Sequence, residues 1–266
     1  MFRLETLPAE LLYDIFIFAL NEHFPHTSKR IYSVFKYAPL SIHAEYIIFK
    51  SLPTDDLPSK TLRFPICTLP VLQTLLRIPA YASILSKHSK STTKLPRRIF
   101  QSLTPNPRIR PIGMKRRNRE PWSTEDAPIP LLRFLLDEPR IPNPDWNYSK
   151  GYPLAKAVMA QFIPLVRFLL ENGASPACKD GLAVRVAITK KNLGLVRMLI
   201  EPEAAVKNKG GSSGRNVRRK LEDRVKPDSE MLKAAMKADA RDIVHYLINE
   251  KGCVPNMQTV LMMRET

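Results

Sequence analysis

Cysteine is scarce in this sequence. The 266-residue chain has three cysteines, far apart and without a partner at metal-ligand or redox spacing: Cys67, Cys178 and Cys253. This pattern excludes a disulfide framework and indicates a reducing compartment. We expect the thiols to behave as small buried apolar groups.

Long apolar runs are absent as well. Glu5, Glu10 and Asp14 interrupt the first twenty residues, which therefore lack the apolar core of a signal peptide. No other stretch approaches the length needed to cross a bilayer. We expect a soluble protein, cytoplasmic or nuclear, with no membrane partner.

The motifs of common enzyme sites are missing. The sequence has no Gly-rich phosphate loop, no His-Glu-x-x-His and no Gly-x-Ser-x-Gly. His23 and His26 are close in sequence but lack a third metal ligand, so we expect them to be solvated. Asp239 and Asp242 lie beside basic residues, where exposed ion pairs are typical. We therefore expect no enzyme, no catalytic residue, no metal and no cofactor.

Acidic residues are few, and the net charge is +17. Residues 86–120 carry eleven Lys or Arg against one acid, and residues 203–226 carry eight against three. These stretches account for +15 of the +17, so the charge is not spread over a folded surface. Both are rich in Pro, Ser or Gly, which is typical of basic insertions.

The basic insertions have three interpretations. The first is an exposed disordered loop. The second is a nuclear import signal, and the third is contact with nucleic acid or an acidic partner. The scarcity of aromatic residues weakens the nucleic-acid interpretation, so we do not expect nucleic acid to be a partner. The candidate residues for import or acidic contact are Lys115, Arg116, Arg117, Arg218, Arg219 and Lys220.

The remaining sequence repeats. Residues 129–136 read IPLLRFLL, and residues 163–170 read IPLVRFLL. Residues 151–171 match residues 181–201 at a shift of 30, and the same template fits again at a shift of 78. Each unit has two apolar segments with helical spacing, small residues in the first and larger aliphatic residues in the second. Such helix pairs cannot bury their apolar faces alone, so we expect them to stack.

The repeat resembles the ankyrin family, whose unit is about 33 residues long. The best match is GYPLAKAVMAQFIPLVRFLLENGASP, residues 151–176. Pro153 lies in the first helical turn, and Gly173 follows the second helix, where a left-handed residue can end it. The family's Thr-Pro-Leu-His reads Tyr-Pro-Leu-Ala here, and the second unit lacks the terminal Gly. The alternative is an unrelated helical array of the TPR or HEAT kind.

The amino-terminal segment predicts a helix over about residues 8–20 with too much apolar surface. Its apolar residues form two neighbouring stripes, one with Leu11, Ile15, Phe18 and Ala19, the other with Leu12, Phe16 and Leu20. An ordinary surface helix has one apolar stripe and a broad polar face. The excess predicts burial by a partner.

The pattern Leu-Pro-x-Glu-Leu-Leu from residue 7 resembles an F-box, a small helical segment that docks on the adaptor subunit of SCF cullin-RING ubiquitin ligases. By this resemblance Leu7 and Pro8 enter the adaptor's apolar surface, and Leu11 and Ile15 continue that face. The alternative is that these apolar residues pack on the first repeat. An F-box ahead of degenerate ankyrin repeats resembles a large fungal family.

These patterns together predict an all-α fold, an F-box-like segment followed by an ankyrin-repeat solenoid with basic disordered insertions. The expected divisions are an F-box-like segment at 1–50, a first ankyrin-like unit at 60–79, a basic insertion at 80–128 with a short helix over 95–103, repeats at 129–201, a basic loop at 202–227, a terminal repeat at 228–256 and a tail at 257–266.

The predicted function is a non-catalytic substrate receptor of an SCF-type ligase. Its expected partners are the SCF adaptor subunit, the cullin-RING core and an unknown substrate protein bound by the repeats. The alternatives are an ankyrin scaffold whose amino-terminal helix caps the stack, and binding of nucleic acid or an acidic partner through the insertions.

Overall fold

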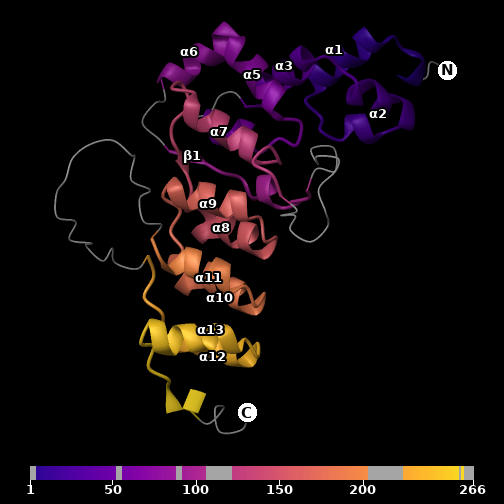
Figure 1. Ribbon diagram of the computed structural model, residues 1–266. Coiled ribbons are helices and arrows are strands. Elements are labelled where there is room, and N and C mark those ends of the chain that lie inside the picture. Colours follow the sequence, from indigo (N-terminus) through magenta and orange to yellow (C-terminus); the bar gives the residue numbers. More distant parts are fainter. Residues whose placement is uncertain are drawn as a thin grey trace, which may run out of the picture. The chain divides into compact units, whose positions relative to one another are not determined.

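The computed structural model describes residues 4–51, 56–87, 92–105, 122–202, 224–257 and 259–260. It is mostly helical, in agreement with the expected all-α class (Figure 1). The chain divides into two compact units, Met1–Ile99 with Ala127–Asp145, and Phe100–Asp126 with Trp146–Thr266. Within the described ranges, no helix has the length and apolar content needed to span a membrane.

The first unit is built from short helices. They are α1 (Ala9–Ala19), α2 (Lys29–Lys36), α3 (Leu40–Ser51), α4 (Leu57–Thr61), α5 (Leu69–Arg77), α6 (Pro79–Lys87) and α7 (Ile129–Asp137), with single 3-10 turns at Leu4–Thr6 and Phe24–His26. Helix α3 packs on α1 and on α5, and α5 packs on α6 and α7. The F-box-like segment expected at residues 1–50 therefore shares a core with the residues that follow it.

The core of the amino-terminal helices is aromatic. The ring of Phe16 stacks on Tyr46 with centroids 4.0 Å apart and planes inclined by 11°. Phe16 also contacts Phe35 at 4.6 Å, and Phe24 meets Phe35 edge-on at 5.7 Å. Stacked and edge-to-face aromatic pairs stabilise a core beyond the area they bury. These rings therefore fix how α1, α2 and α3 pack together.

Parts of the insertion expected at residues 80–128 have regular structure. Residues 80–87 belong to α6, where Tyr81 and Leu85 are buried. Strand β1 (Thr93–Lys94) pairs in parallel with β2 (Pro144–Asp145). The helix expected over 95–103 is a shorter 3-10 helix, Arg97–Phe100. Basic composition alone therefore did not distinguish a loop from a folded segment.

Arg98 shows why a basic stretch can be structural. Its Nε donates to the carbonyl of Leu62 at 2.6 Å, and its Nη2 donates to the carbonyl of Cys67 at 3.1 Å. A guanidinium group has five donors and can join two backbone carbonyls that no helix satisfies. Arg98 thus ties residues 97–99 to the turn between α4 and α5.

The described residues of the second unit form three helix pairs. They are α8 (Tyr148–Met159) with α9 (Ile163–Glu171), α10 (Cys178–Thr189) with α11 (Leu193–Ile200), and α12 (Ser229–Lys237) with α13 (Arg241–His245), which continues as a π-helix at Tyr246–Glu250. Helix α10 packs on both α8 and α12, and α11 packs on both α9 and α13. The pairs therefore follow one another in sequence order, as Figure 1 shows.

The turn inside each pair has the same backbone geometry. Gln161, Lys191 and Asp239 are all left-handed, with φ of 52°, 52° and 49°. The residue after each donates its N–H to a carbonyl five positions earlier, at 3.0 Å, 3.3 Å and 3.0 Å. This is the Schellman ending of a helix. Lys191 follows Gln161 by 30 residues, and Asp239 follows it by 78 residues. These are the shifts at which the sequence repeats.

Other local expectations are also confirmed. Ser149, Lys150 and Gly151 have left-handed backbone, so the regular part of α8 begins after Gly151 and Pro153 lies in its first turn. Gly173 follows α9 with φ of 90°, as expected for a helix-ending glycine. The equivalent glycine of the last pair, Gly252, comes one residue later than the shift of 78 predicts, because the π-helix adds a residue to that helix.

Residues 122–126 of the expected insertion also join the second unit. The indole ring of Trp122 stacks on Phe162, with centroids 4.1 Å apart and an interplanar angle of 12°. Its Nε1 donates to the carbonyl of Ala160 at 3.1 Å. Trp122 therefore covers the turn between α8 and α9.

The glycine at the start of α8 is required for two physical reasons. Gly151 has φ of +74°, and an added Cβ would lie 2.6 Å from Cβ of Cys178. Gly173 has φ of +90°, but an added Cβ would meet nothing within 4 Å. We expect Gly173→Ala to lower the free energy of unfolding by about 1 kcal/mol through backbone strain, and Gly151→Ala by about 3 kcal/mol through strain plus overpacking.

Urea unfolding followed by circular dichroism measures both losses in parallel. Gly173→Ala is the matched control, because it changes the same residue type in the same backbone region without the steric contact. Equal losses for the two variants would show that α8 does not pack against Cys178 in this way.

Candidate functional site

The candidate site lies on the first helix and beside it. Pro8 precedes α1 with an extended backbone (φ −56°, ψ 153°), and Glu10 lies in the first turn, where its charge favours the helix N-terminus. The helix ends at Leu20, which is left-handed and donates its N–H to the carbonyl of Phe16. The helix expected over about residues 8–20 is therefore α1.

One side of α1 is buried in the aromatic core. Leu12, Phe16 and Ile17 are buried, and Phe16 makes the ring contacts described above. Of the two apolar stripes expected on this helix, the one containing Leu12 and Phe16 is therefore the one that packs inside the unit.

The other stripe lies at the surface. Leu11 is 47% exposed and Phe18 is 85% exposed, whereas Ile15 between them is half-buried. The spacing of i, i+4 and i+7 places these three side chains on one side of the helix. Pro8, at the start of the helix, is also exposed. We call Pro8, Leu11, Ile15 and Phe18 the α1 face.

Three of the four residues expected to bind the adaptor belong to the α1 face. They are Pro8, Leu11 and Ile15, whereas Leu7 is half-buried and precedes the helix. Phe18 was not among the expected site residues, although it is the most exposed large apolar side chain of the described residues. Its position seven residues after Leu11 was the sequence signal for it.

The expected basic contacts lie elsewhere in the chain. Lys115, Arg116, Arg117, Arg218, Arg219 and Lys220 are outside the described residues.

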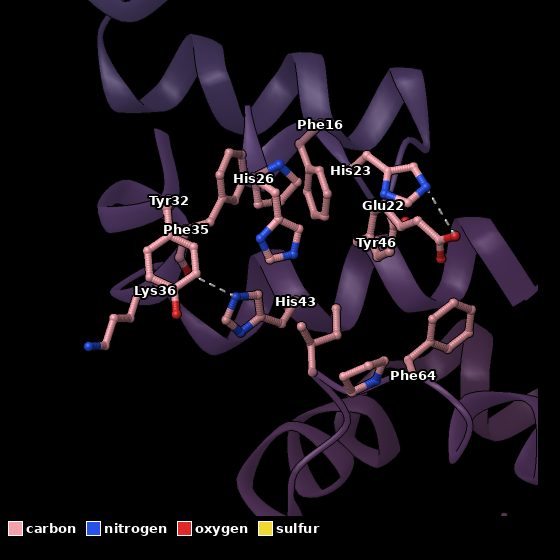
Figure 2. Close-up of a pocket in the computed structure, with 13 residues that line it drawn as sticks. Phe16, Glu22, His23, His26, Tyr32, Phe35, Lys36, His43, Tyr46 and Phe64 are labelled. Carbon is pink, nitrogen blue, oxygen red and sulfur yellow. Dashed lines mark hydrogen bonds and ion pairs between the residues drawn. The ribbon is translucent and has the colours of Figure 1, made fainter. Parts of the chain in front are cut away.

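A pocket of about 490 Å³ lies on the buried side of α1, among α1, α2, α3 and the turn at residues 64–66 (Figure 2). Its inner wall is formed by the rings of Phe16, Phe35 and Tyr46, all buried. Phe64 meets Tyr46 edge-on with centroids 6.3 Å apart. The pocket is therefore mostly aromatic.

Three histidines line this pocket, namely His23, His26 and His43. The first two were expected to be a solvated pair, and both are exposed. His43 comes from α3. It was not expected in this pocket, because nothing in the sequence linked it to the distant His23 and His26. In the described part of the chain, His, Cys, Asp and Glu side chains form no group of three able to hold a metal ion.

His43 has one engaged ring nitrogen. Its Nε2 lies 3.2 Å from the carbonyl oxygen of Phe35, and a carbonyl can only accept, so Nε2 carries the proton. Partial burial lowers the pKa of His43, and the hydrogen bond to Phe35 opposes this in part. The neutral imidazole therefore presents Nδ1 as a hydrogen-bond acceptor.

Comparisons with known proteins give no relative. No protein-family model matches the chain, and neither the curated proteins nor the solved structures contain a match.

The lowered pKa of His43 predicts a pH dependence of stability. Between its lowered folded pKa and the ordinary value of 6.5, the unfolded chain binds more protons than the folded chain. The free energy of unfolding should therefore fall as the pH is lowered below about 6.5, and His43→Phe should reduce this fall. Urea unfolding at pH 7.5 and pH 5.5 measures the difference.

The matched control is His245→Gln, which removes an exposed imidazole from the second unit. A pH dependence that is the same in wild type and His43→Phe would contradict the role given to His43.

Proposed function

We propose that this protein is a non-catalytic substrate receptor of an SCF-type ubiquitin ligase. The α1 face docks on the adaptor subunit, and the stacked helix pairs bind the protein to be modified. The cullin-RING core recruited by the adaptor supplies the transfer chemistry. Leu-Pro-x-Glu-Leu-Leu from residue 7 carries the resemblance to the F-box.

The observation that carries the proposal is the exposure of the α1 face. Phe18 is 85% exposed and Leu11 is 47% exposed on a helix whose other side already fills a core. Burying one large apolar side chain contributes about 1.5–3 kcal/mol. An exposed apolar patch on a rigid helix is the usual anchor for a partner's groove. The exposed side contains three of the residues that the F-box resemblance assigns to the adaptor.

We also propose that the three helix pairs of the second unit are degenerate ankyrin repeats. The repeated left-handed turns at Gln161, Lys191 and Asp239 support this. So do the alanines of the first helices, Ala157, Ala187 and Ala235, which are fully buried. An ankyrin unit consists of a turn followed by two short helices, and its small residues allow close packing of neighbouring units.

The docking proposal predicts that charges on the α1 face abolish adaptor binding. We expect the purified wild-type chain to bind the SCF adaptor subunit, and the double variant Leu11→Asp, Phe18→Asp to bind at least about 100-fold more weakly, because carboxylates cannot enter an apolar groove without losing solvation. Isothermal titration calorimetry measures both affinities.

The control is the double variant Val254→Asp, Met257→Asp, whose side chains are each 80% exposed but lie in the second unit. It introduces the same charges and should bind as wild type does. Failure of the wild-type chain to bind the adaptor would refute the ligase role.

A second candidate function is a repeat scaffold in which the amino-terminal helices serve only to cap the array. The packing of α3 on α5 favours it, because the first helices then shield apolar surface of the next ones. Repeat arrays need such caps for solubility. Deletion of residues 1–50 would expose α5 under either function, so adaptor binding by the intact chain is the measurement that separates them.

A further inference from the structure

The pocket on the buried side of α1 has the properties of a small-molecule site. Its volume of about 490 Å³ lies in the range of roughly 300–1,000 Å³ that is typical of ligand pockets. Such sites combine apolar and aromatic walls with a small number of placed polar groups. The described residues around this pocket provide both.

The wall is rigid and aromatic. Phe16, Phe35 and Tyr46 are between 2% and 5% exposed, and Phe16 contacts both of the other rings, so close packing holds all three in place. Phe64 stands on the side opposite α1, as Figure 2 shows. Aromatic rings are stabilised by offset stacking and edge-to-face contacts with other rings. A flat aromatic ligand is therefore the shape that this wall fits.

The charged residues at the rim of the pocket favour neither a positive nor a negative ligand. They are one acid, Glu22, and one base, Lys36. Glu22 Oε1 lies 3.9 Å from Nε2 of His23, and the ammonium of Lys36 lies over the Tyr37 ring at 5.6 Å from its centroid. Each charge thus has an interacting side chain close by, His23 for Glu22 and Tyr37 for Lys36. The arrangement favours an uncharged ligand.

His43 lines the pocket and brings a specific polar group to it. Its Nε2 is held by the carbonyl of Phe35, and the opposite ring nitrogen, Nδ1, is an acceptor in the neutral imidazole. We propose that the pocket binds an uncharged, planar aromatic small molecule whose N–H or O–H group donates a hydrogen bond to Nδ1 of His43. This site goes beyond the adaptor docking proposed above, because it lies on the other side of α1 from Leu11 and Phe18.

The test uses indole and 1-methylindole as matched probes, because they share one ring system and only indole has an N–H donor. The five histidine rings of the chain give Cε1–H signals in a ¹H–¹³C spectrum that can be followed during titration. We expect indole to shift the signals of His23, His26 and His43 and to leave His245 unmoved, since His245 lies in the second unit. Indole should bind about fivefold more tightly than 1-methylindole, the factor for one net hydrogen bond.

Two variants locate the probe. His43→Phe keeps a ring but removes the acceptor, and the Phe35 carbonyl keeps the backbone N–H groups of Tyr37 and Ala38 as donors. In this variant indole should weaken about fivefold, to the affinity of 1-methylindole, which should not change. Ile66→Trp places a larger side chain in the pocket and should remove binding of both probes.

Phe49→Ala is the control, because Phe49 is 51% exposed on α3 and does not line the pocket. It should bind both probes as wild type does. Three results would overturn the proposal: no shift of the pocket histidines with indole, equal affinity of the two probes for wild type, or wild-type affinity for indole in either His43→Phe or Ile66→Trp. Unchanged 1-methylindole binding by His43→Phe shows that the variant is folded.

Discussion

Close packing between the first helices of successive pairs is the interaction on which the second unit depends. Ala157, Ala187 and Ala235 are fully buried on α8, α10 and α12, and α10 packs on both of the other two helices. A larger side chain at any of these positions would separate two helices and strain both neighbours. The turns inside the pairs also depend on this packing. Gln161, Lys191 and Asp239 keep a left-handed backbone without being glycine. That conformation costs roughly 1–2 kcal/mol per residue, which the packing of the pairs must offset.

The stack tolerates a long insertion because the insertion lies between helix pairs. Helices α11 and α13 pack on each other although a basic Gly/Ser-rich segment separates α11 from α12 in sequence. By general polymer arguments, a connection twice as long costs only about 0.6 kcal/mol more to close. Arg224, which follows the insertion, is hydrogen-bonded to the end of α11. Its N–H donates to the carbonyl of Ile200 at 2.7 Å, and its Nη1 donates to the carbonyl of Met198 at 3.1 Å.

The features that sequence predicted are those with a local period. Apolar spacing identified α1 and the three helix pairs, and the shifts of 30 and 78 reappear in the backbone. Features that depend on distant contacts were not predicted. Arg98 and Trp122 lay in a stretch interpreted as an insertion, and each is held by residues more than thirty positions away. His43 joined His23 and His26 in one pocket only through the packing of α3 on α1.

Some missed features did have a sequence signal. Tyr81 and Leu85 are four residues apart, the spacing of one helix face, and both are buried in α6. The basic and Ser-rich residues that follow them dominated the composition of that region and concealed the period. Composition averages over a window, whereas a helix of nine residues is defined by two or three positions.

Helix α1 serves two surfaces because of its period. At 3.6 residues per turn, Phe16 and Phe18 point about 200° apart around the helix. Phe16 forms part of the pocket wall, and Phe18 is exposed on the α1 face. A ligand in the pocket would therefore not touch the α1 face and could affect it only by changing the stability of α1. Because any molecule that binds only the folded chain stabilises it, occupancy of the pocket would favour the ordered helix that presents Leu11 and Phe18 to a partner.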